Sequence, residues 1–255
     1  MAGQPLTLLP GGQGASWRAR DLVLKPSDQT PGELRWLAEV YSRVVDDGFR
    51  ISRQRVATGG RVAVAGWSAT QWVPGEHAQR RWADIIRLGE RYHAALREIP
   101  RPESLDDRDN PWTTGDKVAW ADQPAGEFAA VPHLRRLLAA RRPVGASSQL
   151  IHGDLGGNVL FHETLPPAVI DFSPYWRPAD FATAIVVGDA LVWEGADEEI
   201  LAAVRTGGDF GQYLIRALIY RIVTERILVK NYPGAAPGTA DPWAPAVEIA
   251  CRLAG

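Results

Sequence analysis

The chain has 255 residues, of which 45% are hydrophobic and 23% charged, as in an ordinary globular protein. Its formal net charge of −2 gives no electrostatic reason to expect nucleic acid or an anionic membrane as a partner. The single cysteine, Cys251, excludes an internal disulfide and fits a reducing compartment. There is no secretory signal pattern at the amino terminus and no apolar run of membrane-spanning length, so we expect a cytoplasmic protein.

The first seventy residues favour short strands and one helix. Extended segments are predicted at 6–9, 15–19, 22–25 and 62–72. Thr30, Pro31 and Glu33 provide a capping hydroxyl, a proline in the first turn and the acid of a capping box, so a helix should begin here. An apolar face follows along this helix, made by Leu37, Val40, Tyr41, Val44 and Val45.

The rest of the chain has mainly helical periodicity. Helices are predicted at about 79–96, 132–142, 179–194, 198–205 and 210–229, with a short one at the carboxyl end. The polar segment 106–126 and the proline-rich segment 233–245 are expected to be irregular. A β-rich part, a short connector at 72–75 and a helical part therefore predict an α+β protein.

The strongest chemical signal lies in the middle of the chain. Residues 150–161 read Leu-Ile-His-Gly-Asp-Leu-Gly-Gly-Asn-Val-Leu-Phe, and residues 169–172 read Val-Ile-Asp-Phe. One apolar strand delivers His152 and Asp154 to a tight loop with Asn158 four residues further on, and a second strand ends at Asp171. The turn at 163–167 favours a hairpin between these segments.

These residue types suit phosphoryl transfer. Catalysis of that reaction is mostly positioning and charge neutralisation, and Mg²⁺ prefers oxygen ligands such as those of Asn158 and Asp171. Asp154 is then available to accept the proton of a substrate hydroxyl. The alternative is that Asp154 and Asn158 only cap turns, because both types hydrogen-bond nearby backbone readily.

The pattern His-Gly-Asp-x-x-x-x-Asn followed by Ile-Asp-Phe resembles the aminoglycoside phosphotransferase family of kinase-like enzymes. The resemblance implies a bilobal protein-kinase-like fold, with residues 1–73 as a nucleotide-binding lobe and 74–255 as a catalytic and acceptor-binding lobe. It also implies ATP or GTP as donor, Mg²⁺ as cofactor and a small hydroxyl compound as acceptor. In this family pattern His152 is an internal hydrogen-bonding residue, and Asp180 resembles a buried aspartate that braces the catalytic loop.

The same resemblance assigns nucleotide contacts to the first part of the chain. Lys25 ends a strand after a glycine-rich turn, as a phosphate-binding lysine would, although a strand-end lysine is often simply solvated. Its acidic partner is expected to be Glu33 rather than Glu39, and Glu33 serves a capping box equally well. Backbone groups complete the predicted nucleotide site. Those of Gly12 and Gly14 are expected over the phosphates, and those of Gln71 and Val73 at the hinge beside the purine.

The acceptor is not identified by the sequence. Tyr175, Trp176 and Arg177 follow the predicted metal aspartate and are candidates to face it. An acidic patch at 193–199 would suit a polycationic aminoglycoside, but acidic residues at the start of a helix are expected from the helix dipole alone. The predicted function is a Mg²⁺-dependent small-molecule O-phosphotransferase, and the alternative is a kinase-shaped sensor that binds a nucleotide or metabolite without transfer.

Overall fold

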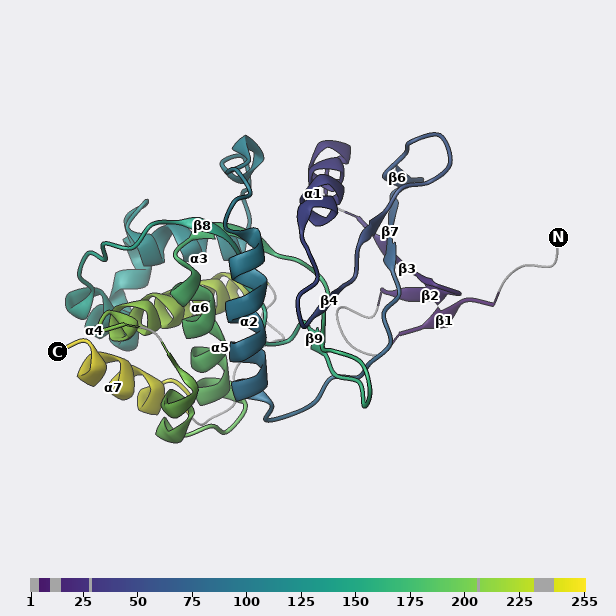
Figure 1. Cartoon of the computed structure of the whole chain (residues 1–255). Coiled ribbons are helices and arrows are strands. Elements are labelled where there is room, and N and C mark those ends of the chain that lie inside the picture. Colours follow the sequence, from purple (N-terminus) through teal and green to yellow (C-terminus); the bar gives the residue numbers. More distant parts are fainter. Residues whose placement is uncertain (1–4, 10–14, 28, 206, 232–240) are drawn as a thin grey trace. The chain divides into compact units, whose positions relative to one another are not determined.

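The structure is a computed structural model that describes residues 5–9, 15–27, 29–205, 207–231 and 241–255. The chain forms two compact units (Figure 1). The smaller unit contains residues 1–78 together with 158–172, and the larger contains 79–157 together with 173–255. The chain therefore leaves the first unit, returns to it and leaves it again, while the functional division at residue 73 stays a prediction.

A six-stranded antiparallel sheet dominates the smaller unit, in the order β1-β2-β3-β7-β5 with β6 paired to β7. Its strands are β1 (Thr7–Leu8), β2 (Trp17–Ala19), β3 (Leu22–Pro26), β5 (Gln54–Arg55), β6 (Ala63–Val64) and β7 (Trp67–Gln71). The single extended segment predicted at 62–72 is wrong, because the chain turns at Ala65 and Gly66. Both residues have positive φ, at 50° and 78°, which is the turn geometry that joins tight hairpins.

Helix α1 (Pro31–Arg43) begins with the predicted capping box, in which Thr30 and Glu33 bond reciprocally. Its buried face contains Leu34, Leu37, Val40 and Tyr41. The predicted membership of Val45 in this face is wrong, since its side chain is 75% exposed. The helix ends at Arg43 and Val44 is already extended, so the helical spacing no longer applies to residue 45.

A second, three-stranded sheet of the smaller unit holds the segment that follows the motif at 152–158. It consists of β4 (Arg50–Ile51), β9 (Val159–Leu160) and β10 (Ala168–Val169). Strand β10 pairs antiparallel with β9 and parallel with β4. The predicted hairpin between the two motif segments is confirmed, and β4 fixes its second strand to the amino-terminal part of the chain.

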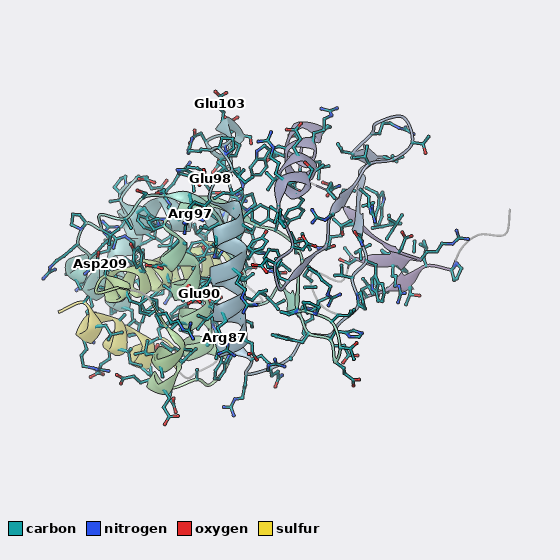
Figure 2. All side chains as sticks on the ribbon, viewed as in Figure 1. Arg87, Glu90, Arg97, Glu98, Glu103 and Asp209 are labelled. Atoms are coloured by element: carbon teal, nitrogen blue, oxygen red, sulfur yellow. The ribbon has the colours of Figure 1, made fainter. Side chains whose placement is uncertain are left out.

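The larger unit is mainly helical. Its α-helices are α2 (Trp82–Leu96), α3 (Pro111–Trp120), α4 (Pro132–Ala140), α5 (Ala179–Trp193), α6 (Phe210–Asn231) and α7 (Ala244–Leu253), and its 3₁₀ helices are η1 (Glu103–Leu105), η2 (Gly126–Ala130) and η3 (Glu198–Ala203). Helix α6 packs against α3, α4, α5 and α7, and all its residues from 210 to 224 are buried (Figure 1). On α2 the charged side chains Arg87 and Glu90 lie on the exposed face (Figure 2). This unit is thus organised around α6.

Two predictions for the larger unit need correction. The segment expected to be irregular contains α3, which Asn110 caps and Pro111 opens, a combination that favours a helix start. The helix expected at 198–205 is the shorter 3₁₀ helix η3. Strands β8 (Gln149–His152) and β11 (Pro174–Arg177) form an antiparallel pair beside the helices. The α+β class is confirmed, and β8 leads directly into Gly153 and Asp154.

Candidate active site

The loop that carries Asp154 is fixed where β8 ends. The N–H of Gly153 donates to the carbonyl of Ser173 at 2.8 Å, which ties the loop to β11. A Cβ atom at position 153 would overlap the ring of Tyr175. The close approach of the tyrosine therefore requires glycine at this position. Because the backbone of Gly153 is fixed, the backbone of the next residue, Asp154, is fixed as well.

Two buried histidines support the same loop from inside the larger unit. The N–H of His152 donates to Nε2 of His93 at 3.1 Å, and the N–H of Asp154 donates to Nδ1 of His152 at 3.1 Å. Burial, with a contribution from His152, lowers the pKa of His93 to about 3, so the ring is neutral and can accept this bond. His152 thus has the internal hydrogen-bonding role predicted for it, and His93 continues that chain of bonds into α2.

The carboxylate of Asp154 lies beside a buried arginine that the sequence analysis missed. Arg221 Nη2 is 2.6 Å from Asp154 Oδ1, and the same guanidinium bonds both oxygens of Asp189. Asp189 and Arg221 are buried, whereas the side chain of Asp154 is 44% exposed. The arrangement holds one oxygen of Asp154 against a fixed cation while the carboxylate stays open to a ligand.

Electrostatics keep Arg221 charged despite its burial. Burial lowers its pKa, but its partners together, Asp189 foremost and Asp154 with it, more than compensate, and the net effect is a pKa well above the usual value. Burial raises the pKa of Asp189, and Arg221 opposes that rise. The available signal for this pair was the presence of charged residues in mainly apolar helical stretches, with Asp189 in α5 and both Arg216 and Arg221 in α6, because such residues are seldom buried unless paired. The bracing contact to Asp154 comes from Asp189 through Arg221, whereas Asp180 is half-buried at the start of α5.

The predicted metal ligands lie in the smaller unit at the end of the β9–β10 hairpin. The N–H of Ile170 donates to the carbonyl of Asn158 at 3.0 Å, so Asn158 and Asp171 both belong to the end of the hairpin opposite its turn. Asp171 has φ of 50°, a left-handed conformation uncommon outside glycine, and its side chain is 59% exposed. Backbone strain of this kind is frequent at functional positions.

Lys25 and Asp171 form an ion pair. Lys25 Nζ lies 2.8 Å from Asp171 Oδ2, although the residues are far apart in sequence. A cation is thus already held at the carboxylate proposed to bind Mg²⁺, and the oxygen donors of Asn158 and Asp171 fit a hard divalent ion. Within the described residues there is no group of three or more His, Cys, Asp or Glu side chains suited to a metal. The structure therefore brings together the predicted phosphate-binding lysine and one of the two predicted metal ligands.

The other residues predicted to contact the nucleotide have different partners in the structure. Glu33 accepts bonds from the N–H and hydroxyl of Thr30 at 2.8 and 2.9 Å, so it acts here in the capping box, and its pairing with Lys25 stays a prediction. Gln71 donates its N–H to the carbonyl of Arg53 and accepts from the hydroxyl of Ser52. Two further predicted positions fall outside the described residues, namely Gly12 and Gly14. Val73 is buried just beyond β7, where the predicted hinge lies.

Comparison with known proteins identifies the class. The phosphotransferase enzyme family model matches residues 8–213, and the chain belongs to this family. Among solved structures, aminoglycoside phosphotransferase from Alicyclobacillus acidocaldarius is similar with TM-score 0.57 and 16% identity, over 93% of this chain and 83% of that one. Choline kinase LicA from Streptococcus pneumoniae is similar with TM-score 0.58 and 11% identity, over 98% and 92%.

A third structure shows the same fold with ligands. A thermostable mutant of aminoglycoside phosphotransferase APH(4)-Ia, in ternary complex with ADP and hygromycin B, has TM-score 0.60 and 12% identity, over 98% of this chain and 94% of that one. No curated protein sequence matches the chain significantly. The family match confirms the predicted family, and the structural likenesses confirm the protein-kinase-like fold. The chain is accordingly a phosphotransferase by family.

Proposed function

We propose that this protein transfers the γ-phosphoryl group of ATP or GTP to a hydroxyl of a small molecule, with Mg²⁺ as cofactor. The observation that carries the proposal is that the carboxylate of Asp154 is partly exposed and fixed in place. Arg221 binds one of its oxygens, and the backbone N–H of Asp154 donates to His152. Such a carboxylate is oriented for an incoming hydroxyl without further rearrangement.

In the proposed reaction the acceptor hydroxyl donates a hydrogen bond to Asp154. As the oxygen of that hydroxyl forms its bond to the γ-phosphorus, the bond from phosphorus to the bridging oxygen of the nucleoside diphosphate breaks, and the proton passes to Asp154. Lys25 binds the nucleotide phosphates, and Asn158 and Asp171 would hold the cation through their side-chain oxygens. Mg²⁺, when bound, neutralises charge that develops on the phosphate oxygens.

Each predicted role has its own place in this scheme. Glu33 becomes the partner of Lys25 if the capping bond opens, with Gly12 and Gly14 over the phosphates. Backbone groups of Val73 contact the base together with the carbonyl of Gln71, which accepts a second bond beside that from Ser52. Among the described residues we find no helix with the length and apolar character of a bilayer span. The cytoplasmic location stays a prediction of the sequence.

The alternative of a sensor without transfer makes a different prediction for the same protein. A thermal-shift titration with ATP and GTP, with and without Mg²⁺, should show stabilisation that grows with ligand concentration. We expect Asp171→Asn to lose the Mg²⁺-dependent part of the shift. Asp154→Ala should keep the shift but lose about a hundredfold or more of the transfer rate to any acceptor, because general-base catalysis contributes on that scale.

A matched control for these variants is Asp47→Asn, which changes an exposed aspartate of the smaller unit. It should behave as the wild type in both assays. A nucleotide-dependent shift with no transfer to any of a broad panel of hydroxyl compounds would favour the sensor. Full turnover in both Asp154→Ala and Asp171→Asn would show that the site is assigned to the wrong residues.

A further inference from the structure

A cavity of about 500 Å³ lies within the larger unit, between β11, α3 and the segment 101–108. This volume lies in the usual range of small-molecule sites. Its wall contains four cationic and three anionic side chains, so its formal charge is +1, although the whole chain carries −2. The cationic residues are Arg101, Arg108, Lys117 and Arg177, and the anionic ones are Asp106, Asp116 and Asp122.

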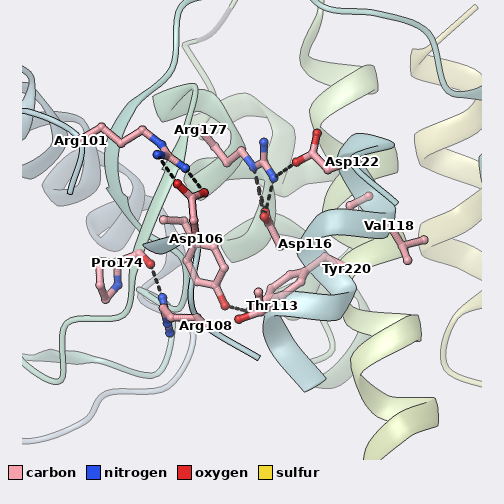
Figure 3. A network of polar contacts seen from close by, with 12 residues as sticks. Arg101, Asp106, Arg108, Thr113, Asp116, Val118, Asp122, Pro174, Arg177 and Tyr220 are labelled. Carbon is pink, nitrogen blue, oxygen red and sulfur yellow. Dashed lines mark hydrogen bonds and ion pairs between the residues drawn. The ribbon is translucent and has the colours of Figure 1, made fainter. Parts of the chain in front are cut away.

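All three carboxylates of the wall are engaged by two of the arginines. Arg177 Nη2 lies 2.6 Å from an oxygen of Asp116 and 2.6 Å from an oxygen of Asp122. Arg101 forms a two-pronged pair with Asp106 (Figure 3). These pairs leave little negative charge for a cationic ligand to use, because each carboxylate already has a guanidinium partner.

The two other cationic residues of the wall, Arg108 and Lys117, are not paired with these carboxylates. Within the described residues no carboxylate lies within 4.0 Å of the charged nitrogens of Arg108 or Lys117. Arg108 is nevertheless held in place, since it donates to the carbonyl of Pro174 at 2.6 Å and lies 5.3 Å from the ring centre of Tyr175. The cavity thus offers one positioned guanidinium and one ammonium without a carboxylate partner.

The cavity also borders the loop that carries the proposed base. Tyr175 lines it and packs against Gly153, the residue before Asp154. Its hydroxyl lies 3.4 Å from that of Tyr220, the neighbour of Arg221. A ligand in the cavity would therefore contact a side chain that supports the loop and the arginine beside Asp154.

We infer that this cavity binds the acceptor through an anionic group, either a carboxylate or a phosphate, recognised by Arg108 and Lys117. The inference rests on the proposed function for the role of the ligand as acceptor, but binding itself needs neither nucleotide nor transfer. The inferred acceptor is anionic, so its charge is opposite to that of a polycationic aminoglycoside. The acidic patch at 193–199 has no part in this site, because none of its residues lines the cavity.

The test uses four hexose-based probes that differ in charge: glucuronate, glucose 6-phosphate, glucose and glucosamine. Their binding to the full chain is measured by saturation-transfer NMR and isothermal titration in the absence of nucleotide. We expect both anionic probes to bind at least tenfold more tightly than glucose, with glucosamine weakest. The ratio between glucuronate and glucose 6-phosphate then shows which anionic group the cavity prefers.

Lys117→Gln is the sharpest variant, because the lysine makes no ion pair in the described structure that its removal would break. It should weaken binding of both anionic probes about tenfold, the scale of one charge-assisted hydrogen bond. Lys117→Glu should reverse the order in favour of glucosamine. Lys230→Gln, which removes an exposed lysine paired with Glu127, is the matched control and should leave all four affinities unchanged.

Several results would overturn the inference: glucosamine binding as tightly as glucuronate, absence of binding by both anionic probes, or anion affinities unchanged in Lys117→Gln. Transfer from ATP to glucosamine in preference to glucuronate would also overturn it and leave the proposed function standing. Anion binding that depends on Lys117, in a protein with no nucleotide-dependent thermal shift, would support the anion site and overturn the proposed function.

Discussion

Buried histidines position the residue on which the proposed chemistry depends. His93 accepts from the backbone of His152, which in turn accepts from the backbone of Asp154. A protonated ring at His93 could no longer accept, and its charge would be buried without a counterion at high cost. The stability of the loop is therefore linked to the protonation of a residue outside it.

This linkage predicts a pH dependence of stability. In the unfolded chain His93 titrates near 6.5, whereas in the folded chain its pKa is about 3. Between these values the unfolded state binds the additional proton, so the contribution of His93 is fully present above pH 6.5 and is lost as the pH falls toward 3. The expected slope is about 1.4 kcal/mol per pH unit for one proton.

The measurement is the free energy of unfolding by urea at several pH values, compared between the wild type and His93→Gln. Other groups titrate in the same window, so the difference between the two proteins isolates this histidine. The variant should be less stable than the wild type at neutral pH and should approach it as the pH falls. Parallel curves over the whole range would contradict a depressed pKa at His93.

At the scale of elements, helices α3 and α6 pack closely because the residue of α3 at their contact, Gly115, has no side chain. A Cβ at Gly115 would lie 2.5 Å from Oγ1 of Thr224 and 2.6 Å from the carbonyl oxygen of Tyr220. Both neighbours belong to the buried part of α6, and the carbonyl cannot move without disturbing that helix. Close packing of α3 therefore supports the helix that carries Arg221.

We expect Gly115→Ala to destabilise the protein by about 1–3 kcal/mol, the usual cost of overpacking a filled core. Gly188→Ala is the matched control, because it also lies inside a helix but its Cβ would meet its neighbours at 3.6 Å or more. That variant should be neutral or stabilising by up to about 1 kcal/mol through helix propensity. Equal midpoints of thermal unfolding for the two variants would disprove the close approach.

On the scale of the whole molecule, the smaller unit is not continuous in sequence. Ile51 pairs with Val169, and Phe172 packs on Tyr41 with their rings 5.6 Å apart. Phe172 also lies against the core cluster of Leu34 and Leu37. The segment 158–172 thus supplies both a strand and a core residue that the first 78 residues lack.

A fragment of residues 1–78 should consequently not fold cooperatively, because its β4 edge and part of its core stay open to water. Addition of residues 158–172 through a flexible glycine-serine linker should restore a cooperative transition. The comparison is made by thermal unfolding and by dispersion of backbone amide NMR signals. A fragment 1–78 that unfolds with the same midpoint as the linked form would show that the hairpin is dispensable.

Local interactions could be predicted from the sequence. The capping box at Thr30 and Glu33, the strand before His152 and the β9–β10 hairpin follow from short-range preferences of turns, caps and apolar runs. The family pattern around Asp154 and Asp171 was equally visible, because its residues lie within a short stretch of chain. Where a local signal was overlooked, as at Asn110 and Pro111, the information was nonetheless present.

By itself, then, the sequence determined the family, the α+β class and the residues around which phosphoryl transfer is proposed. Only the tertiary structure decided that Lys25 lies beside Asp171, that Arg221 and Asp189 hold Asp154, and that a cationic cavity adjoins the same loop. The ion pairs among these contacts join residues 32 to 146 positions apart in sequence. Periodicity and motif spacing report only neighbours along the chain, whereas such pairs form when helices and strands that are distant in sequence pack against one another.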